Sequence, residues 1–395
     1  EMPELTLPPT HPARVLWDVT GTLDLEKFLA KAKAVEGGLG RSTKSPRLKL
    51  ALWLYAITQA VGSAREIARL TKTDAAYQWL VGDVTLCHDT LSEFRVGHGE
   101  ALDALMTDIL ASLMHKGVLS LDVVAQDGIR IRAAATAPSF RSYGSLLECR
   151  AQAALHLKAV LAQADDPEYT DAQKVAREVA ARDFQSRVEE AIVEVQSMQA
   201  AREPSEKEPR ASTTDAEARV MKMPDGGFRP AYNVQMATDG DPMGGPRTIV
   251  GVQLTNVGSD MGSVTPMLKD IETRTGRLPK TLLADANHAK HECIRNAEER
   301  GVEVLIAPPK NAKPVPPDAD PADGVVKWRE RMESEDGKRL YRARASLCEL
   351  TNAHFRSHHG VDQFLVRGID KVKCVVFLAA IAANLTQHAA TLLHG

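Results

Sequence analysis

Apolar residues recur at helical spacing through the first third of the chain, over residues 14–118. The segment Arg47–Val61 is apolar at intervals of three and four, which predicts a helix. Ser63 and Glu66 have the spacing of a capping box, so a second helix is expected to begin there. Further short helices are predicted over 73–79, 90–96 and 100–115. This region is therefore expected to form a bundle of short helices.

The pattern changes at Leu119, and Leu121–Ala133 has the character of a strand. Further strands are expected at 232–238, 248–255, 281–284 and 302–306. Further helices are expected at 261–274, 288–300, 335–357 and 371–388. The strand–helix–strand order of 281–306 predicts a parallel crossover, and the fold class is α/β with a mixed sheet flanked by helices.

Residues 145–200 are again helical and predict a long antiparallel hairpin. Its first arm is expected over Leu146–Ala164, and Thr170 with Gln173 forms a capping box for the second arm. That arm carries an apolar stripe at spacings of mostly three or four, made of Val175, Val179, Phe184, Val188, Ile192, Val195 and Met198. We expect an insertion at about 145–215, packed on itself or against a second subunit.

Composition limits the class of protein. Lys and Arg number 49 and Asp and Glu 52, a net charge of −3, so the chain is not histone-like, although local basic patches remain open to DNA. The five cysteines lie far apart with no Cys-x-x-Cys pair, which favours a reducing cytoplasm. The longest apolar run, Val375–Ala383, is too short to cross a bilayer, and the first residues show no signal-peptide pattern, so no membrane partner is expected.

A basic edge in the helical region is a candidate DNA contact. It consists of Arg41, Lys44, Arg47 and Lys49. Phosphate binding needs local rather than net positive charge, so the balanced charge of the region does not exclude it. The alternative is a small helical accessory domain with a solvated edge.

Asp127 interrupts an apolar face. If 123–133 is one continuous strand, its odd positions share a face, and all of them except Asp127 are apolar. A carboxylate there is costly unless it is paired or bound to metal. The alternative is that Asp127-Gly128 forms a two-residue hairpin turn.

Asp285 follows the apolar strand Thr281–Ala284 and precedes a helix. The carboxyl ends of strands in open α/β sheets border the binding crevice. The alternative is an ordinary helix N-cap, for which Asp is well suited.

Glu349 lies on a polar, mainly cationic helix face. Arg342, Ser346, Glu349, Asn352 and Arg356 follow at spacings of three and four. One interpretation is a solvated helix face, whose ion pairs contribute little to stability. The other is that Glu349 binds metal while the arginines around it bind phosphate. Together with Asp127 and Asp285 it supplies the carboxylates that two Mg²⁺ (or Mn²⁺) ions need for phosphodiester cleavage.

In these segments the sequence resembles the DDE transposases of bacterial insertion sequences, whose catalytic core is RNase H-like. Val124–Ala133 resembles the strand of the first Asp, Leu282–His288 the strand of the second, and Tyr341, Arg344, Glu349 and Arg356 the Tyr–Arg–Glu–Lys signature. Three departures stand out: four residues instead of three between Arg344 and Glu349, Asn287-His288 in place of Gly-Tyr, and Arg356 in place of Lys.

The resemblance implies a site and a domain plan. Asp127, Asp285 and Glu349 would be the metal-binding triad, and Arg342, Arg344 and Arg356 would hold phosphates. Residues 1–118 would form a DNA-binding domain, and 119–395 an RNase H-like catalytic domain with the inserted hairpin. The expected activity is cleavage of element ends and strand transfer into double-stranded target DNA by a homodimer in the cytoplasm. Two alternatives stay open, a nuclease that does not join ends and an inactive or domesticated DNA-binding relative.

Three further side-chain groups suggest other chemistry. Histidines and a cysteine gather near Asp285 (His288, His291, Cys293) and histidines near Glu349 (His354, His358, His359), so a zinc site is an alternative to solvated histidines. Cys348 is expected to be a buried thiol rather than a nucleophile. Trp328, flanked by Lys327, Arg329 and Arg331, is a candidate to stack on an extruded base, with a core tryptophan as the alternative.

Overall fold

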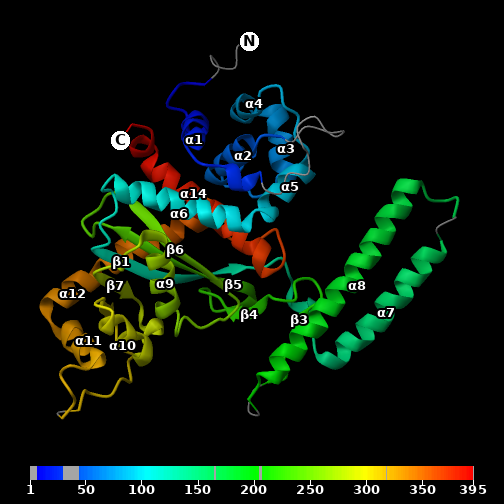
Figure 1. The fold of residues 1–395 in the computed structure, drawn as a ribbon. Coiled ribbons are helices and arrows are strands. Elements are labelled where there is room, and N and C mark those ends of the chain that lie inside the picture. The colour runs from blue at the N-terminus through cyan, green and yellow to red at the C-terminus, as the bar shows by residue number, and fades with distance from the viewer. Residues whose placement is uncertain (1–6, 30–43, 164–165, 204–206, 317, 395) are drawn as a thin grey trace.

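The computed structural model describes residues 7–29, 44–163, 166–203, 207–316 and 318–394. It has three parts: a helical bundle near the N-terminus, a mixed sheet covered by helices, and a helical hairpin that projects from the sheet (Figure 1). The coarse prediction of a mixed α/β chain is confirmed.

The N-terminal bundle consists of short helices around one apolar core. They are α1 (Pro12–Gly21), α2 (Pro46–Thr58), α3 (Ala64–Thr73), α4 (Ala75–Val81), α5 (His88–Gly97) and α6 (Gly99–His115). Helix α2 is the centre, because its residues from Leu50 to Ile57 are all buried. The Ser63 side chain caps α3 by accepting from Glu66 N, which is the first half of the predicted capping box, while the Glu66 side chain pairs with Arg69.

The sheet is mixed and centres on β1 (Val123–Arg132). On one side β1 pairs antiparallel with β5 (Phe228–Gly240), which in turn pairs antiparallel with β4 (Arg219–Lys222) and β6 (Arg247–Thr255). On the other side β1 pairs parallel with β7 (Thr281–Ala284), and β7 pairs parallel with β8 (Glu303–Ile306). The predicted crossover is thus present, with helix α10 (His291–Glu299) between β7 and β8.

Helices cover the sheet and join it to the bundle. They are α9 (Val264–Thr275), α11 (Gly324–Glu333), α12 (Glu335–Arg342), α13 (Leu350–Ser357) and α14 (Ile369–His394). Helix α14 packs against α6 and β6 and also reaches α2 and α5, so it ties the two parts into one core. The single helix predicted over 335–357 is instead divided, with a π turn at Ala345–Glu349 between α12 and α13.

Helix α14 bears on the expected absence of a membrane partner. Among the described residues it is the one helix long and apolar enough to cross a membrane, and it extends well beyond the short apolar run Val375–Ala383. Of its most apolar window, 56% is buried inside the protein. A core helix meets the same length and composition test, so this is weak support for a membrane span.

The predicted hairpin is formed by α7 (Tyr143–Ala162) and α8 (Asp171–Ala200), with the Thr170–Gln173 capping box in place. Two short strands, β2 (Phe140–Arg141) and β3 (Ala211–Ser212), pair at its root. The apolar stripe is buried only near the root, because Val188, Ile192 and Val195 pack together while Val175 and Val179 remain exposed. The predicted stripe therefore forms a core only near the root, and the distal half of the hairpin buries Val160 and Ala181 instead.

Candidate active site

Asp127 lies in the middle of a continuous strand. In the antiparallel ladder it faces Met236 of β5, so the alternative of an Asp127-Gly128 hairpin turn is wrong. Its Oδ1 accepts from Gly128 N at 2.9 Å. Gly128 is required by a close approach, since a Cβ there would lie 2.1 Å from Gln235 Nε2. The strand thus places a largely buried carboxylate on the apolar face that the sequence indicated.

Asp285 follows β7 directly beside this position. The parallel register pairs Ala125 with Leu283, so its extension by two residues brings Asp285 alongside Asp127. The N-cap alternative also holds, because Oδ1 of Asp285 accepts from Asn287 N at 3.0 Å at the start of a short 3₁₀ turn. Asn287 Nδ2 donates to Asp285 Oδ2 at 2.8 Å. Capping and a place in the site are therefore compatible.

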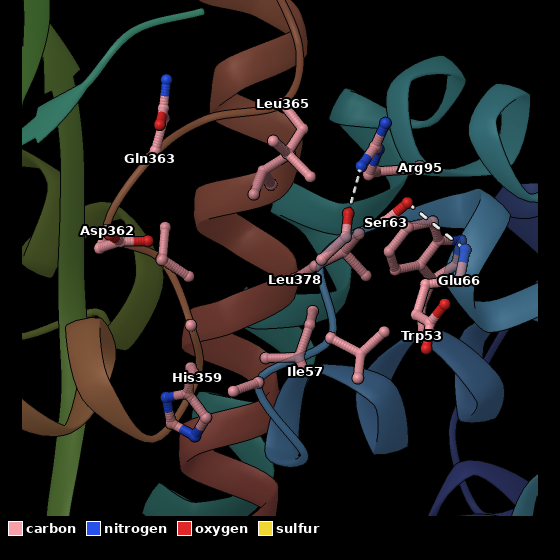
Figure 2. A pocket seen from close by; sticks show the side chains of 16 residues that line it. Trp53, Ile57, Ser63, Glu66, Arg95, His359, Asp362, Gln363, Leu365 and Leu378 are labelled. Atoms are coloured by element: carbon pink, nitrogen blue, oxygen red, sulfur yellow. Dashed lines mark hydrogen bonds between the residues drawn. The ribbon is translucent and has the colours of Figure 1, made fainter. Parts of the chain in front are cut away.

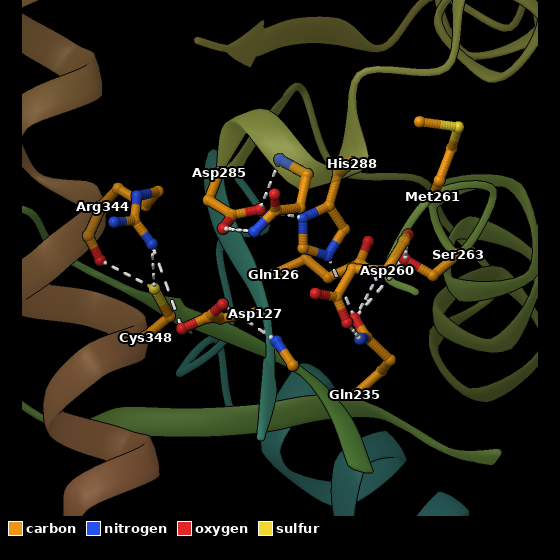
Figure 3. A network of polar contacts seen from close by, with 12 residues as sticks. Gln126, Asp127, Gln235, Asp260, Met261, Ser263, Asp285, His288, Arg344 and Cys348 are labelled. Atoms are coloured by element: carbon orange, nitrogen blue, oxygen red, sulfur yellow. Dashed lines mark hydrogen bonds and ion pairs between the residues drawn. The ribbon is translucent and has the colours of Figure 1, made fainter. Parts of the chain in front are cut away.

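Behind Asp285 lies a chain of buried polar contacts (Figure 3). His288 Nδ1 lies 2.5 Å from Asp285 Oδ1, and His288 Nε2 lies 3.1 Å from Gln235 Oε1. The Gln235 amide is oriented by Asp260, whose Oδ1 accepts from Gln235 Nε2 at 2.7 Å and from Asn233 Nδ2 at 2.8 Å. His288 is fully buried, and each of its ring nitrogens faces an oxygen. Hydrogen bonds of this kind fix the orientation of a carboxylate.

Glu349 approaches the site from the helix side. It ends the π turn Ala345–Glu349, and a turn of that kind brings residues five apart onto one face. Arg344 Nη2 donates to Glu349 Oε1 at 2.9 Å, while Arg344 Nη1 lies 4.0 Å from Asp127 Oδ2. Asn352 Nδ2 donates to Asp127 Oδ2 at 3.0 Å. The additional residue between Arg344 and Glu349 is thus accommodated, and Arg344 connects both acids.

The two aspartates differ in electrostatics. Burial raises the pKa of Asp127; Arg344 opposes the rise, the negative charge of Asp285 adds to it, and the pKa lies above its usual value. Burial also acts to raise the pKa of Asp285, but the hydrogen bond and charge of His288 outweigh it, and the pKa lies below its usual value. Two neighbouring carboxylates with opposite shifts are typical of functional sites.

The three predicted acids are not gathered into one ligand group. In the described part of the chain, no set of three or more His, Cys, Asp or Glu side chains is arranged to hold a metal ion. Asp127 and Asp285 adjoin each other, whereas the Glu349 side chain is 56% exposed and paired with Arg344. The zinc alternative has no such group among these residues either, and His288 is engaged by Asp285 and Gln235.

Cys348 is a buried thiol, as predicted, but it lies within the site. Its Sγ accepts from Arg344 Nη1 at 3.4 Å (Figure 3). Burial, then the charge of Asp127, raises the pKa of Cys348 to about 12, so the thiol stays protonated at neutral pH. A nucleophilic role is therefore not supported.

Trp328 does not lie where the base-stacking hypothesis requires an accessible indole. Its side chain is fully buried in the main core, and Nε1 donates to Ile306 O of β8 at 2.8 Å. The alternative of a core tryptophan applies, because a buried indole has no face open to a base. Of the other cations predicted to contact DNA near the site, Arg342 is exposed at the end of α12, and Arg356 is half-buried on α13.

The basic edge of the bundle is only partly available. Arg41 lies outside the described residues, and Lys44 is exposed. Arg47 stacks over Trp17 at 4.0 Å and donates to Trp17 O, so it fastens α2 to α1. Lys49 lies 5.2 Å above the Phe94 ring, and burial lowers its pKa. Arg47 and Lys49 thus make internal contacts, and their assignment to a DNA-binding edge stays a prediction.

Some residues of the site were not assigned a role from the sequence. Helical spacing placed Asn352 on the Glu349 face, and the sequence pattern left His288 as a solvated or zinc-binding histidine. Gln235 and Asp260 belong to segments far from Asp285 in the chain, and only strand pairing brings them behind it. The single local signal was the spacing of three residues between Asp285 and His288.

Two protein-family models match the chain, one toward each end. Residues 4–97 match the family described as Transposase domain (DUF772). Residues 321–389, which include Arg344, Glu349 and Arg356, match the family described as Transposase DDE domain. No curated protein and no solved structure matches the chain. Two transposase-domain matches in one chain indicate a transposase function and a DNA substrate, and they are consistent with an insertion-sequence DDE transposase.

Proposed function

We propose that the protein is a metal-dependent DDE transposase that cleaves DNA at insertion-sequence ends and transfers the freed strand into target DNA, with Asp127, Asp285 and Glu349 as its catalytic acids. The observation that carries this proposal is the pairing of β1 with β7, which sets Asp127 beside Asp285, together with the contacts of Arg344 and Asn352 across β1. The match of 321–389 to a transposase DDE domain agrees with it.

The sheet supports an RNase H-like core. Its order is β4-β5-β1-β7-β8, with β6 also paired to β5, so three antiparallel pairings lie on one side of β1 and two parallel ones on the other. The hairpin α7–α8 enters the chain between β1 and β5, as an insertion does. We accordingly divide the chain into an N-terminal helical DNA-binding domain, 1–118, and a catalytic domain, 119–395.

The donor set fits a hard divalent cation. Asp127 and Asp285 offer carboxylate oxygens, which Mg²⁺ and Mn²⁺ prefer, and burial, with a further contribution from the charge of Asp285, raises the pKa of Asp127. Asp127, Asp285 and Glu349 would hold two such ions. When bound, the ions would supply activation of the attacking oxygen and stabilisation of the leaving one.

The residues of the chain have distinct roles in this proposal. His288 and Asn287 orient Asp285, and Asn352 orients Asp127. Arg344, now paired with Glu349, exchanges that partner for a DNA phosphate, which releases the Glu349 carboxylate to the aspartates. Arg342 and Arg356 hold neighbouring phosphates of double-stranded DNA, and two copies of the chain act together on two DNA ends in the cytoplasm.

The test is cleavage and strand transfer on paired DNA ends with Mg²⁺ or Mn²⁺. Asp127→Asn, Asp285→Asn and Glu349→Gln should each abolish both products and keep DNA binding. Asp122→Asn, which alters an exposed acid just before β1 that pairs with Lys280, should stay active. Full activity of any of the three triad variants would refute the assignment, and cleavage without joining would identify a nuclease.

A second candidate is a catalytically inactive DNA-binding relative. The observation that favours it is the position of Glu349, whose exposed carboxylate is held by Arg344 while Cys348 lies next to Asp127. This candidate predicts DNA binding without metal-dependent cleavage by the wild-type protein.

A further inference from the structure

A cavity of about 340 Å³ separates the N-terminal bundle from the segment that leads into α14 (Figure 2). One wall comes from α2 and the turn after it, with Trp53, Ile57 and Ser63. The opposite wall comes from residues 359–365 and from Leu378 of α14. The lining is mainly apolar. Asp127, Asp285 and Glu349 are not among its residues, so the cavity is separate from the candidate active site.

Arg95 of α5 lies in this wall without a counterion. Its side chain is 93% buried, since 7% is exposed. Nη1 donates to Gly62 O at 2.7 Å, the guanidinium lies 5.0 Å from the Trp53 ring, and the buried Nε has no hydrogen-bond partner. Within the described residues no carboxylate forms an ion pair with Arg95, and burial lowers its pKa. A buried cation without a counterion is costly and therefore calls for an anionic ligand.

The facing wall carries a second unsatisfied polar group. His359 is 9% exposed, and its buried Nδ1 has no hydrogen-bond partner. Burial lowers the pKa of His359 to about 4, so at neutral pH the ring is uncharged. Its Nδ1 can then donate or accept one hydrogen bond with a ligand, depending on the tautomer. Gly360 fixes this wall, because a Cβ there would lie 2.7 Å from Ala60 O of the opposite wall.

A smaller cavity of about 240 Å³ adjoins the first. The two share Ser63, Arg95 and Leu365. The smaller one adds Arg65 and His88 to its lining, with Asp89 as its acid. The guanidinium of Arg95 therefore stands between an apolar chamber and a polar one.

We propose that this pair of cavities binds a nucleotide, with the phosphate on Arg95 in the polar chamber and the base in the apolar chamber against Trp53, Ile57 and Leu378. The planar guanidinium fork suits a phosphate. The volume of about 340 Å³ is at the small end for ligand sites, which suits one base rather than a larger group.

The polar groups of the apolar chamber favour a base over an aliphatic chain. A nucleobase has flat apolar faces and polar edges, whereas a fatty acid has no polar group beyond its carboxylate. The edges can use the free Nδ1 of His359 and the side chains of Ser63 and Gln363, all of which line the chamber. The nucleotide comes either from a DNA strand or from solution, and the chemistry is the same for both.

The experiment measures binding by full-length protein in EDTA, so that it does not depend on cleavage or on metal. The probes are inorganic phosphate, a deoxynucleoside, its 5′-monophosphate and a short single-stranded oligonucleotide. The monophosphate should bind roughly tenfold or more tightly than either phosphate or the nucleoside. Arg95→Met should weaken it by roughly 10- to 100-fold. Leu365→Trp should weaken it similarly by filling the entrance, and the exposed position of Leu365 protects the fold.

The matched control is Arg182→Met, which removes an exposed arginine of α8 that pairs with Glu178 far from both cavities, and it should leave binding unchanged. Competition by the oligonucleotide at lower concentration than the monophosphate supports a nucleotide within DNA, and no competition supports a free nucleotide. Phosphate that binds as tightly as the monophosphate overturns the proposal, because the apolar chamber then has no part. Absence of binding by all probes, with Arg95→Met folded and stable, also overturns it.

Discussion

The two sides of the candidate active site are built in different ways. On the strand side, Asp127 and Asp285 stand on paired strands, and Asp285 is braced by His288, Gln235 and the buried Asp260. On the helix side, Glu349 ends a π turn, is more than half exposed, and forms an ion pair with Arg344. The strand side is therefore prearranged, and the helix side is the part able to move.

The difference has an energetic reason. A carboxylate inside a sheet loses water and must recover the loss through fixed hydrogen bonds, which makes its position definite. A carboxylate at a helix surface keeps its water, and an ion pair there contributes little to stability. A site that must admit DNA and cations benefits from one exposed carboxylate such as that of Glu349, since breaking its ion pair with Arg344 costs little free energy.

The largest effect is expected from the support of the strand side. Trp328 pins α11 onto β8, next to β7, so Trp328→Ala should lower the free energy of unfolding by about 3–5 kcal/mol. Urea unfolding would measure the change, with the exposed Lys327→Ala as the control. A stable Trp328→Ala variant that has lost DNA affinity would restore the stacking hypothesis.

Removal of the brace behind Asp285 should have the next largest effect. His288→Ala should weaken Mn²⁺ binding and reduce cleavage by about 10- to 100-fold, because Asp285 loses the donor that orients it. His288→Gln retains an N–H donor and should recover part of the loss. The control is His291→Ala, an exposed histidine of the next helix. If His291→Ala reduces Mn²⁺ binding as much as His288→Ala does, the brace has no specific role.

The two aspartates should respond to pH in opposite directions in metal-free buffer. The folded-state pKa of Asp285 is lowered, so its stabilisation is present above the unfolded pKa and is lost as pH falls through the folded one. Asp285→Asn should therefore cost about 1–2 kcal/mol at pH 7 and less in acid. The pKa of Asp127 is raised, so Asp127→Asn should be neutral in acid and stabilising once pH exceeds the folded pKa. Thermal unfolding between pH 3 and 7 would measure both changes in stability. If Asp285→Asn and Asp127→Asn changed the stability in the same direction at pH 7, the opposite pKa shifts of the two aspartates would be contradicted.

The smallest effect is expected on the helix side. Glu349→Gln should change the free energy of unfolding by no more than about 0.5 kcal/mol, as is usual for an exposed position. The same variant should still lose cleavage if Glu349 belongs to the triad. A loss of stability comparable to that of Asp285→Asn would show that the helix side is as rigid as the strand side.

Much of the fold could be predicted from local patterns. The strand Thr281–Ala284 and the start of the second hairpin arm after Thr170 agree with the structure residue for residue, because alternation and capping depend on near neighbours. The prediction of one continuous helix over 335–357 was wrong in the middle of that range, because helical periodicity gave no indication of the π turn there. The failure of the distal stripe at Val175 and Val179 has a related cause, since periodicity tells which face is apolar and not what covers it.

The sequence by itself determined the mixed α/β class, the three candidate acids and their order along the chain. Tertiary structure alone decided that Asp127 is a strand residue next to Asp285, that Arg344 joins Asp127 to Glu349, and that Trp328 is core. It also decided that Arg95 is a buried cation facing His359 across a cavity. The physical reason is that local patterns record backbone preferences over a few residues, whereas burial and charge pairing depend on segments that meet only when the sheet and bundle have closed.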